Sequence, residues 1–251
     1  MEVHNHPNHV THKKKWGEYL LEFLMLFLAV FLGFVAENIR ENIVEQHREK
    51  EYIKSMIQDL KTDTTNLGNL IIVYDARIRI QDSLMLSFDS INNGQYRLFM
   101  RNIKSITGFP DFINADATVQ QLKNSGGFRL IKNKSAVDSI MAYTSRVQST
   151  LINQSSLSAL LKELNAVRYE IINYRELFKE QMNAKAKEQI KAEPIDYLQI
   201  HDKRELEKFF DKIYRFQDLM RIIQSINFVP LKQHAARLIV FLQKEYHLQN
   251  E

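Results

Sequence analysis

The chain has 251 residues, of which 45% are hydrophobic and 25% are charged. Only seven Gly and four Pro occur, which disfavours a sheet-rich fold with many tight turns and favours long helices. The 34 basic and 30 acidic residues are mixed along the chain, so it lacks the clustered basic face of a nucleic-acid-binding protein. Cysteine is absent, which excludes disulfides, thiolate metal sites and a cysteine nucleophile.

Residues 1–15 form a polar segment that we predict to be a disordered cytoplasmic tail. The tail contains His4, His6, His9 and His12, and it ends in three lysines. Neutral imidazoles bind zinc, copper or nickel, so a weak metal site is the alternative to a solvated tail. We favour the solvated tail because no carboxylate or cysteine framework fixes the imidazole geometry. No other metal or cofactor is expected.

Residues 16–36 have the composition of a membrane anchor. Between Tyr19 and Ala36 the only ionisable residue is Glu22, and a helix of this length measures about 27 Å, close to the hydrocarbon thickness of a bilayer. A cleaved signal peptide is the alternative, but residues 34–36 read Phe-Val-Ala, a poor cleavage site. We therefore expect a retained anchor in contact with a lipid bilayer.

The charges beside the anchor predict its orientation. Lys13, Lys14 and Lys15 precede Trp16 and Tyr19, and basic residues next to interfacial aromatics are typical of the cytoplasmic side of a membrane. The sequence therefore predicts a cytoplasmic N-terminus and an exported domain over residues 37–251.

One face of the anchor contains Glu22, Ala29, Gly33 and Ala36 at helical spacing. Small residues on one face allow two helix backbones to approach closely. The two interpretations are a lipid-facing helix with incidental small residues and a helix that self-associates through this face.

The rest of the chain predicts an all-α fold, in which the transmembrane helix continues into a long helix of an antiparallel helical bundle. Residues 62–68 weaken this long helix and are expected to kink or interrupt it, and residues 92–94, Asn-Asn-Gly, end it. Its apolar positions recur with a heptad-like spacing: Ile53, Ile57, Leu60, Thr64, Leu67, Ile71, Tyr74, Ile78, Met85 and Phe88.

The middle of the chain predicts short helices and aromatic turns. A helix is expected over residues 96–106, and Asp116 is expected to cap a second helix that ends near Lys123. Phe109, Phe112 and Phe128 lie in the intervening and following turns. These three rings either line a recognition loop or plug one end of the bundle, and we favour the plug.

Three further helices are expected after residue 131. Ser135 and Asp138 resemble a capping box before a second long helix that runs to about Met182. Asp202 caps a third helix, which Pro230 breaks, and residues 231–248 form the last helix. The expected inner side of the third helix consists of Leu206, Phe209, Phe210, Ile213, Leu219, Ile222 and Ile226.

Two blocks of sequence resemble a family of uncharacterised bacterial single-pass membrane proteins with a His-rich N-terminus. The first block runs over residues 18–41 and includes the anchor, and the second runs over residues 121–131, Gln-Leu-Lys-Asn-Ser-Gly-Gly-Phe-Arg-Leu-Ile. The resemblance implies the inner membrane of a bacterium, with the helical domain in the periplasm. It implies no activity, because the family has no known function.

No motif of a catalytic site occurs in the chain. It lacks a Gly-rich phosphate loop, a Gly-x-Ser-x-Gly elbow and a His-Glu-x-x-His pair, so we do not expect an enzyme. The first hypothesis is a membrane-anchored structural or interaction protein that self-associates or scaffolds an unidentified membrane or periplasmic protein. The alternative is an extracytoplasmic ligand-sensing module that acts through a partner protein.

Overall fold

The computed structural model describes residues 15–88, 91, 96–103, 106, 108–186 and 197–248. Within these ranges the chain is mostly helical and has no β-strand, apart from an isolated bridge between Ile172 and Leu198, so the all-α prediction is confirmed. Contacts divide the chain into two units, Met1–Glu51 and Tyr52–Glu251. The four histidines of the predicted tail and the predicted terminator at residues 92–94 lie outside the described residues.

The helices follow one another without a sheet. In chain order they are α1 (Trp16–Met85), α3 (Tyr96–Ile103), α4 (Ala117–Asn124), the 3₁₀ helix η2 (Gly127–Leu130), α5 (Lys134–Ile171), α6 (Tyr174–Ala186), α7 (Lys203–Ile222), the π-helical η3 (Ile223–Phe228) and α8 (Val229–Glu245).

The predicted apolar stripe of α1 is buried in the second unit. Ile53, Leu60, Leu67 and Tyr74 have no exposed surface. The helix is not interrupted at residues 62–68, because α1 is continuous there. The hydroxyls of Thr62, Thr64 and Thr65 donate to the carbonyls four residues earlier, so these side chains are satisfied inside the helix instead of competing with it.

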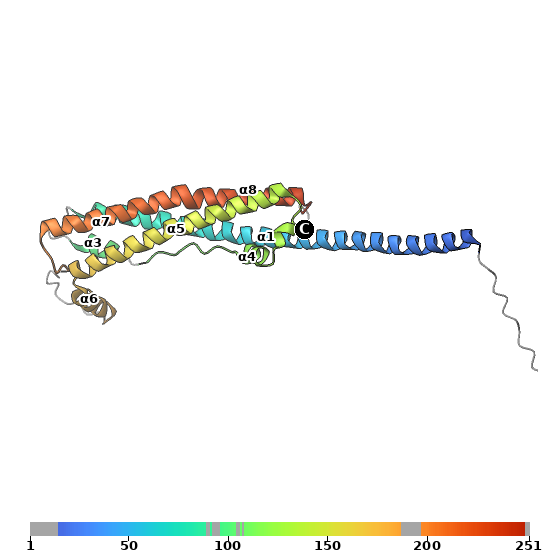
Figure 1. Ribbon diagram of the computed structural model, residues 1–251. Helices are drawn as coiled ribbons and strands as arrows, with labels where there is room; N and C mark the ends of the chain where they lie inside the picture. The colour runs from blue at the N-terminus through green and yellow to red at the C-terminus, as the bar shows by residue number, and fades with distance from the viewer. Residues whose placement is uncertain are drawn as a thin grey trace, which may run out of the picture. The chain divides into compact units, whose positions relative to one another are not determined.

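Two glutamines fix the register between α1 and the α7–η3 segment. Gln217 Nε2 donates to Ile78 O at 3.2 Å and to Asp82 Oδ1 at 2.7 Å. Seven residues later, Gln224 Nε2 donates to the carbonyl of Ile71 at 3.2 Å and to Asp75 Oδ1 at 2.6 Å. Residue numbers rise on one helix as they fall on the other, so the two helices run in opposite directions (Figure 1).

Pro230 does not break the third helix, which corrects the prediction. The chain stays helical through residues 223–228 as a π-helix, and Pro230 lies in the first turn of α8. A proline ring clashes with the carbonyl four residues earlier, and a π-helical turn is one way in which a helix accommodates such a disruption. The predicted inner positions Ile222 and Ile226 are exposed and Ile223 is buried, because the buried face follows Phe216, Met220 and Ile223 instead.

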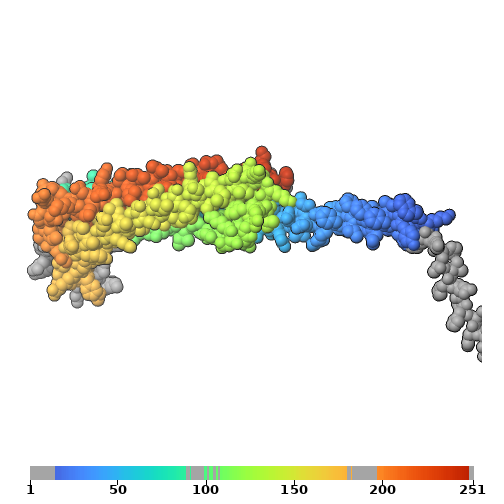
Figure 2. Space-filling model, in the orientation of Figure 1, coloured from blue at the N-terminus to red at the C-terminus, as the bar shows by residue number. Residues whose placement is uncertain are grey.

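Helix α5 also lies against α8 in the opposite direction. Asn133 Nδ2 donates to Glu245 Oε2 at 3.0 Å, and Asn153 Nδ2 donates to Asn227 Oδ1 at 3.2 Å. Figure 2 shows α5 in yellow-green along the orange and red α7 and α8. Because both α1 and α5 oppose α7–η3–α8, α1 and α5 run in the same direction.

The second long helix begins and ends at different residues from those predicted. Asn133 is the N-cap of α5, and its side chain accepts from Ala136 N, so the cap is not Ser135. Helix α5 ends at Ile171, and α6 begins at Tyr174. The helix predicted to reach Met182 is therefore two helices.

A non-helical stretch, residues 108–116, returns the chain along the bundle before α5, and we call it the return segment. Gln154 of α5 holds its centre, because Oε1 accepts from Phe112 N at 2.7 Å and Nε2 donates to Phe112 O at 3.3 Å. From α1, Asp63 Oδ1 accepts from Ala115 N at 2.7 Å, and Asp59 Oδ2 accepts from Thr118 N at 3.0 Å. Asp116, the predicted cap of α4, makes no side-chain cap bond.

Replacing Gln154 with Ala is expected to destabilise the second unit. The substitution leaves the buried N–H of Phe112 without its side-chain acceptor, which costs about 1–3 kcal/mol. Urea unfolding of the detergent-solubilised chain, followed by circular dichroism, measures this loss.

The matched control is Gln148→Ala, because Gln148 is an exposed residue of the same helix. Equal free energies of unfolding for the two variants would contradict the assigned role of Gln154.

Candidate functional site

The apolar N-terminal part of α1 is the largest uncovered apolar surface among the described residues. Its exposed fractions include 64% for Phe23, 58% for Phe27 and 50% for Phe31. Helix α1 is long and apolar enough to cross a membrane, and none of its most apolar 18-residue window is buried. The core helix of a soluble protein is also long and apolar but is mostly buried, unlike this part of α1. A signal sequence near the N-terminus has the same length and composition.

The predicted interaction face lies on this uncovered part of α1. Glu22, Ala29, Gly33 and Ala36 are all exposed. Apart from its chain neighbours and the backbone of its own helix, a Cβ added at Gly33 would have no atom of the described residues within 4 Å. The backbone at Gly33 is thus open to close approach by lipid or by another helix.

The three aromatic residues of the predicted recognition loop do not project into solvent as a group. Phe112 is 2% exposed. The ring of Phe109 lies 6.1 Å from that of Tyr74 and 5.0 Å from that of Phe216. Phe128 is half-buried and packs against the core from η2. Phe109 and Phe112 therefore anchor the return segment to the helices.

Two hollows flank the return segment. One, of about 300 Å³, lies between Asn66, Leu70 and Val73 of α1 and residues 110–113. The other, of about 230 Å³, lies between residues 108–111 and the helices α5 and α7. Asp111 lines both hollows, so the return segment separates them.

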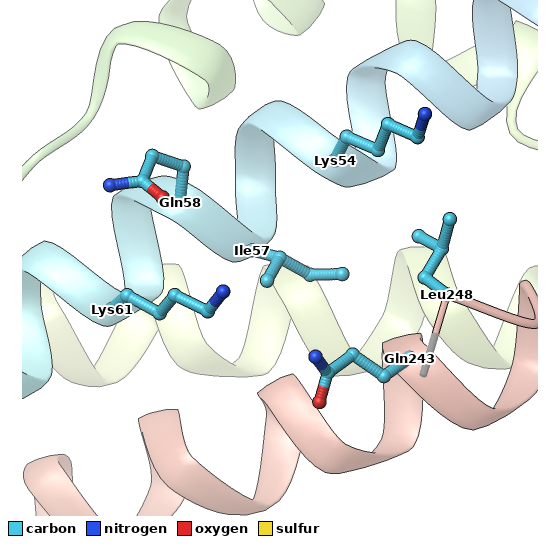
Figure 3. Close-up of a pocket in the computed structure, with 6 residues that line it drawn as sticks. All are labelled: Lys54, Ile57, Gln58, Lys61, Gln243 and Leu248. Atoms are coloured by element: carbon cyan, nitrogen blue, oxygen red, sulfur yellow. The ribbon is translucent and has the colours of Figure 1, made fainter. Parts of the chain in front are cut away.

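A third pocket, of about 160 Å³, lies between α1 and the end of α8. Lys54, Gln58 and Lys61 contribute from α1, opposite Gln243 and Leu248 (Figure 3). Figure 3 shows the two ammonium groups on opposite sides of Ile57. Because these cations do not converge, the pocket does not form a single anion site.

A buried carboxylate links α1, α5 and the return segment. Asp63 is 1% exposed, and its Oδ2 accepts from the hydroxyl of Tyr143 at 2.6 Å while Oδ1 accepts from Ala115 N. Burial raises the pKa of Asp63 above its usual value, and the negative charges of Asp59 and Asp116 raise it further. The hydrogen bonds from Tyr143 and Ala115 lower this pKa but do not cancel the shift. Burial also raises the pKa of Tyr143 strongly, which keeps its hydroxyl protonated as the donor.

Sequence reasoning missed Asp63 and Gln154. Each is one polar residue in a helical pattern, and its hydrogen-bond partner lies 42 to 80 residues away in the sequence. Leu60 and Thr64 are successive positions of the apolar stripe of α1. Asp63 directly precedes Thr64, so the heptad spacing places it beside the buried stripe. That position was the only available signal.

Comparisons with protein-family models, with curated proteins and with solved structures found no match to the chain. Among the described residues, no group of three or more His, Asp or Glu is placed to hold a metal ion. His47 and His234 lie in helices, His247 lies in the turn after α8, and His201 lies in the segment before α7. The candidate sites are therefore the uncovered part of α1 and the hollows beside the return segment.

Asp63 should make folding stability depend on pH. Its folded-state pKa is raised, so the folded chain binds this proton more tightly than the unfolded chain, whose Asp pKa is about 3.9. The free energy of unfolding should therefore fall as pH rises from about 4 through the folded-state pKa. Urea unfolding at a series of pH values measures this slope.

The control is Asp63→Asn, which keeps an acceptor oxygen and cannot titrate. Its stability should depend less steeply on pH than that of the wild-type chain over the same range. If the free energy of unfolding changed equally with pH in the wild-type chain and in Asp63→Asn, the pH dependence would come from other groups.

Proposed function

We propose that the protein is a single-pass protein of a bacterial cytoplasmic membrane. Residues 16–36 cross the bilayer, the N-terminus is cytoplasmic, and residues 37–251 form a helical domain on the periplasmic side. The exposure of the whole apolar window of α1 supports this most directly. At roughly 25 cal/mol per Å² of apolar surface removed from water, the large exposed side chains of this window strongly favour lipid.

The proposed role is interaction and not catalysis. Self-association through the Glu22, Ala29, Gly33 and Ala36 face would bring two copies of the helical domain together at the membrane. Support comes from the open backbone at Gly33 and from the small-residue spacing that membrane helices use for close packing. A dimeric anchor with a large outer domain is suited to scaffolding a second membrane or periplasmic protein.

The anchor is tested by placing two charges in the span. The double substitution Leu24→Arg with Leu28→Arg should cost about 5–7 kcal/mol of insertion free energy, at about 2.5–3.5 kcal/mol for each charge near the bilayer centre. Alkaline washing of membranes should then release the variant while the wild-type chain stays in the pellet.

The control for the anchor is Ile72→Arg with Ile80→Arg, since both positions are exposed and lie on the second unit. This variant should stay in the membrane pellet. Release of the wild-type chain by the alkaline wash would overturn the anchor.

The self-association face is tested by disulfide crosslinking, for which the cysteine-free chain is well suited. Single cysteines at Ala29, Gly33 and Ala36 should give covalent dimers in oxidised membranes, because a shared interface brings equivalent positions together. Cysteines at Val30 and Phe34 should give few dimers. Uniform crosslinking at all five positions, or none at any, would contradict the proposed face.

A further inference from the structure

The hollow between the return segment and the α5–α7 pair combines both charges with an apolar floor. Leu157 and Phe216 line it and are 4% and 0% exposed. Phe109 adds a ring that lies against Phe216. The volume of about 230 Å³ far exceeds what one water molecule needs, so the hollow has room for a small organic molecule.

The lining includes one basic and one acidic residue, Lys162 of α5 and Asp111 of the return segment. Both side chains are exposed. Neither side chain has an ion pair or a hydrogen bond among the described residues, although the negative charge of Asp111 also contributes to the raised pKa of Tyr74 on α1. Both groups therefore remain available for a ligand.

Two neutral polar residues complete the lining. Ser155 and Ser156 donate to the carbonyls four residues earlier, whereas Ser158, which lines the hollow, makes no such bond in the described structure. Asn165 also lines the hollow, and its buried Oδ1 has no hydrogen-bond partner in the part of the chain that the structure describes. A ligand donor that reached this oxygen would satisfy a buried acceptor that otherwise carries a desolvation cost.

We propose that this hollow binds a small zwitterion with an apolar body, of which a free hydrophobic amino acid is the simplest example. The carboxylate of the ligand pairs with Lys162, its ammonium group pairs with Asp111 and Asn165, and its side chain lies on Leu157 and Phe216. A ligand of one charge would leave either Lys162 or Asp111 unmatched. The hollow between α1 and residues 110–113 has no basic residue in its lining, so it lacks this pairing.

This inference goes beyond the proposed anchoring and does not depend on it. The hollow lies entirely within the second unit, and its occupancy is measured independently of membrane insertion. It supplies the ligand site that an extracytoplasmic sensing module requires.

The test is calorimetric titration of the full chain in detergent micelles with L-leucine. Lys162→Met and Asp111→Asn should each weaken binding at least about tenfold, because each removes a charge-assisted contact. Lys134→Met, at an exposed position of the same helix, should leave the affinity unchanged. All variants are also compared by thermal unfolding, so that a loss of fold is recognised.

Ligand analogues assign each charge to its partner. L-leucine amide lacks the carboxylate, so its affinity should be unchanged by Lys162→Met but lowered by Asp111→Asn. 4-Methylpentanoate lacks the ammonium group and should show the reverse pattern. No binding of leucine at about 10 mM, or binding that neither substitution weakens, would overturn the proposal.

Discussion

The need of α1 to bury two different apolar surfaces determines the rest of the structure. From Ile53 onwards its heptad stripe is covered by the chain itself, whereas the apolar side chains between Tyr19 and Phe34 are covered by nothing in the described residues. Apolar surface of this extent is not stable in water. We therefore propose that one helix belongs to two environments, and the proposed membrane protein follows from that division.

Polar side chains give the helical domain its specific register. Apolar stripes allow helices to slide past one another, because many apolar contacts are interchangeable. Gln217 and Gln224 remove that freedom by binding backbone carbonyls of α1 seven residues apart. Gln154 and Asp63 do the same for the return segment, and the placement of this segment creates the hollow with Lys162 and Asp111.

Much of the helical content was predictable, since the stripe of α1 and the cap at Asp202 depend on local spacing. The continuity of the helix through Pro230 was not predictable, because a π-helical turn depends on the packing on both sides of it. The path of the return segment along the bundle was equally unpredictable from the sequence. Its anchors, Gln154 and Asp63, are distant in sequence and look like ordinary polar positions of a helix. The hollow was not predictable either, because its lining residues Lys162 and Asp111 lie on α5 and on the return segment, whose relative placement the sequence does not show.

The accessibility of single cysteines along α1 to a water-soluble maleimide, measured in native membranes, tests the central claim most directly. The account predicts no labelling between residues 20 and 36, where lipid covers the helix. Labelling should appear at the exposed positions Ile39 and Ile43 and disappear again at the buried positions Ile53 and Leu60. Strong labelling throughout residues 20–36 would contradict the membrane span and the account built on it.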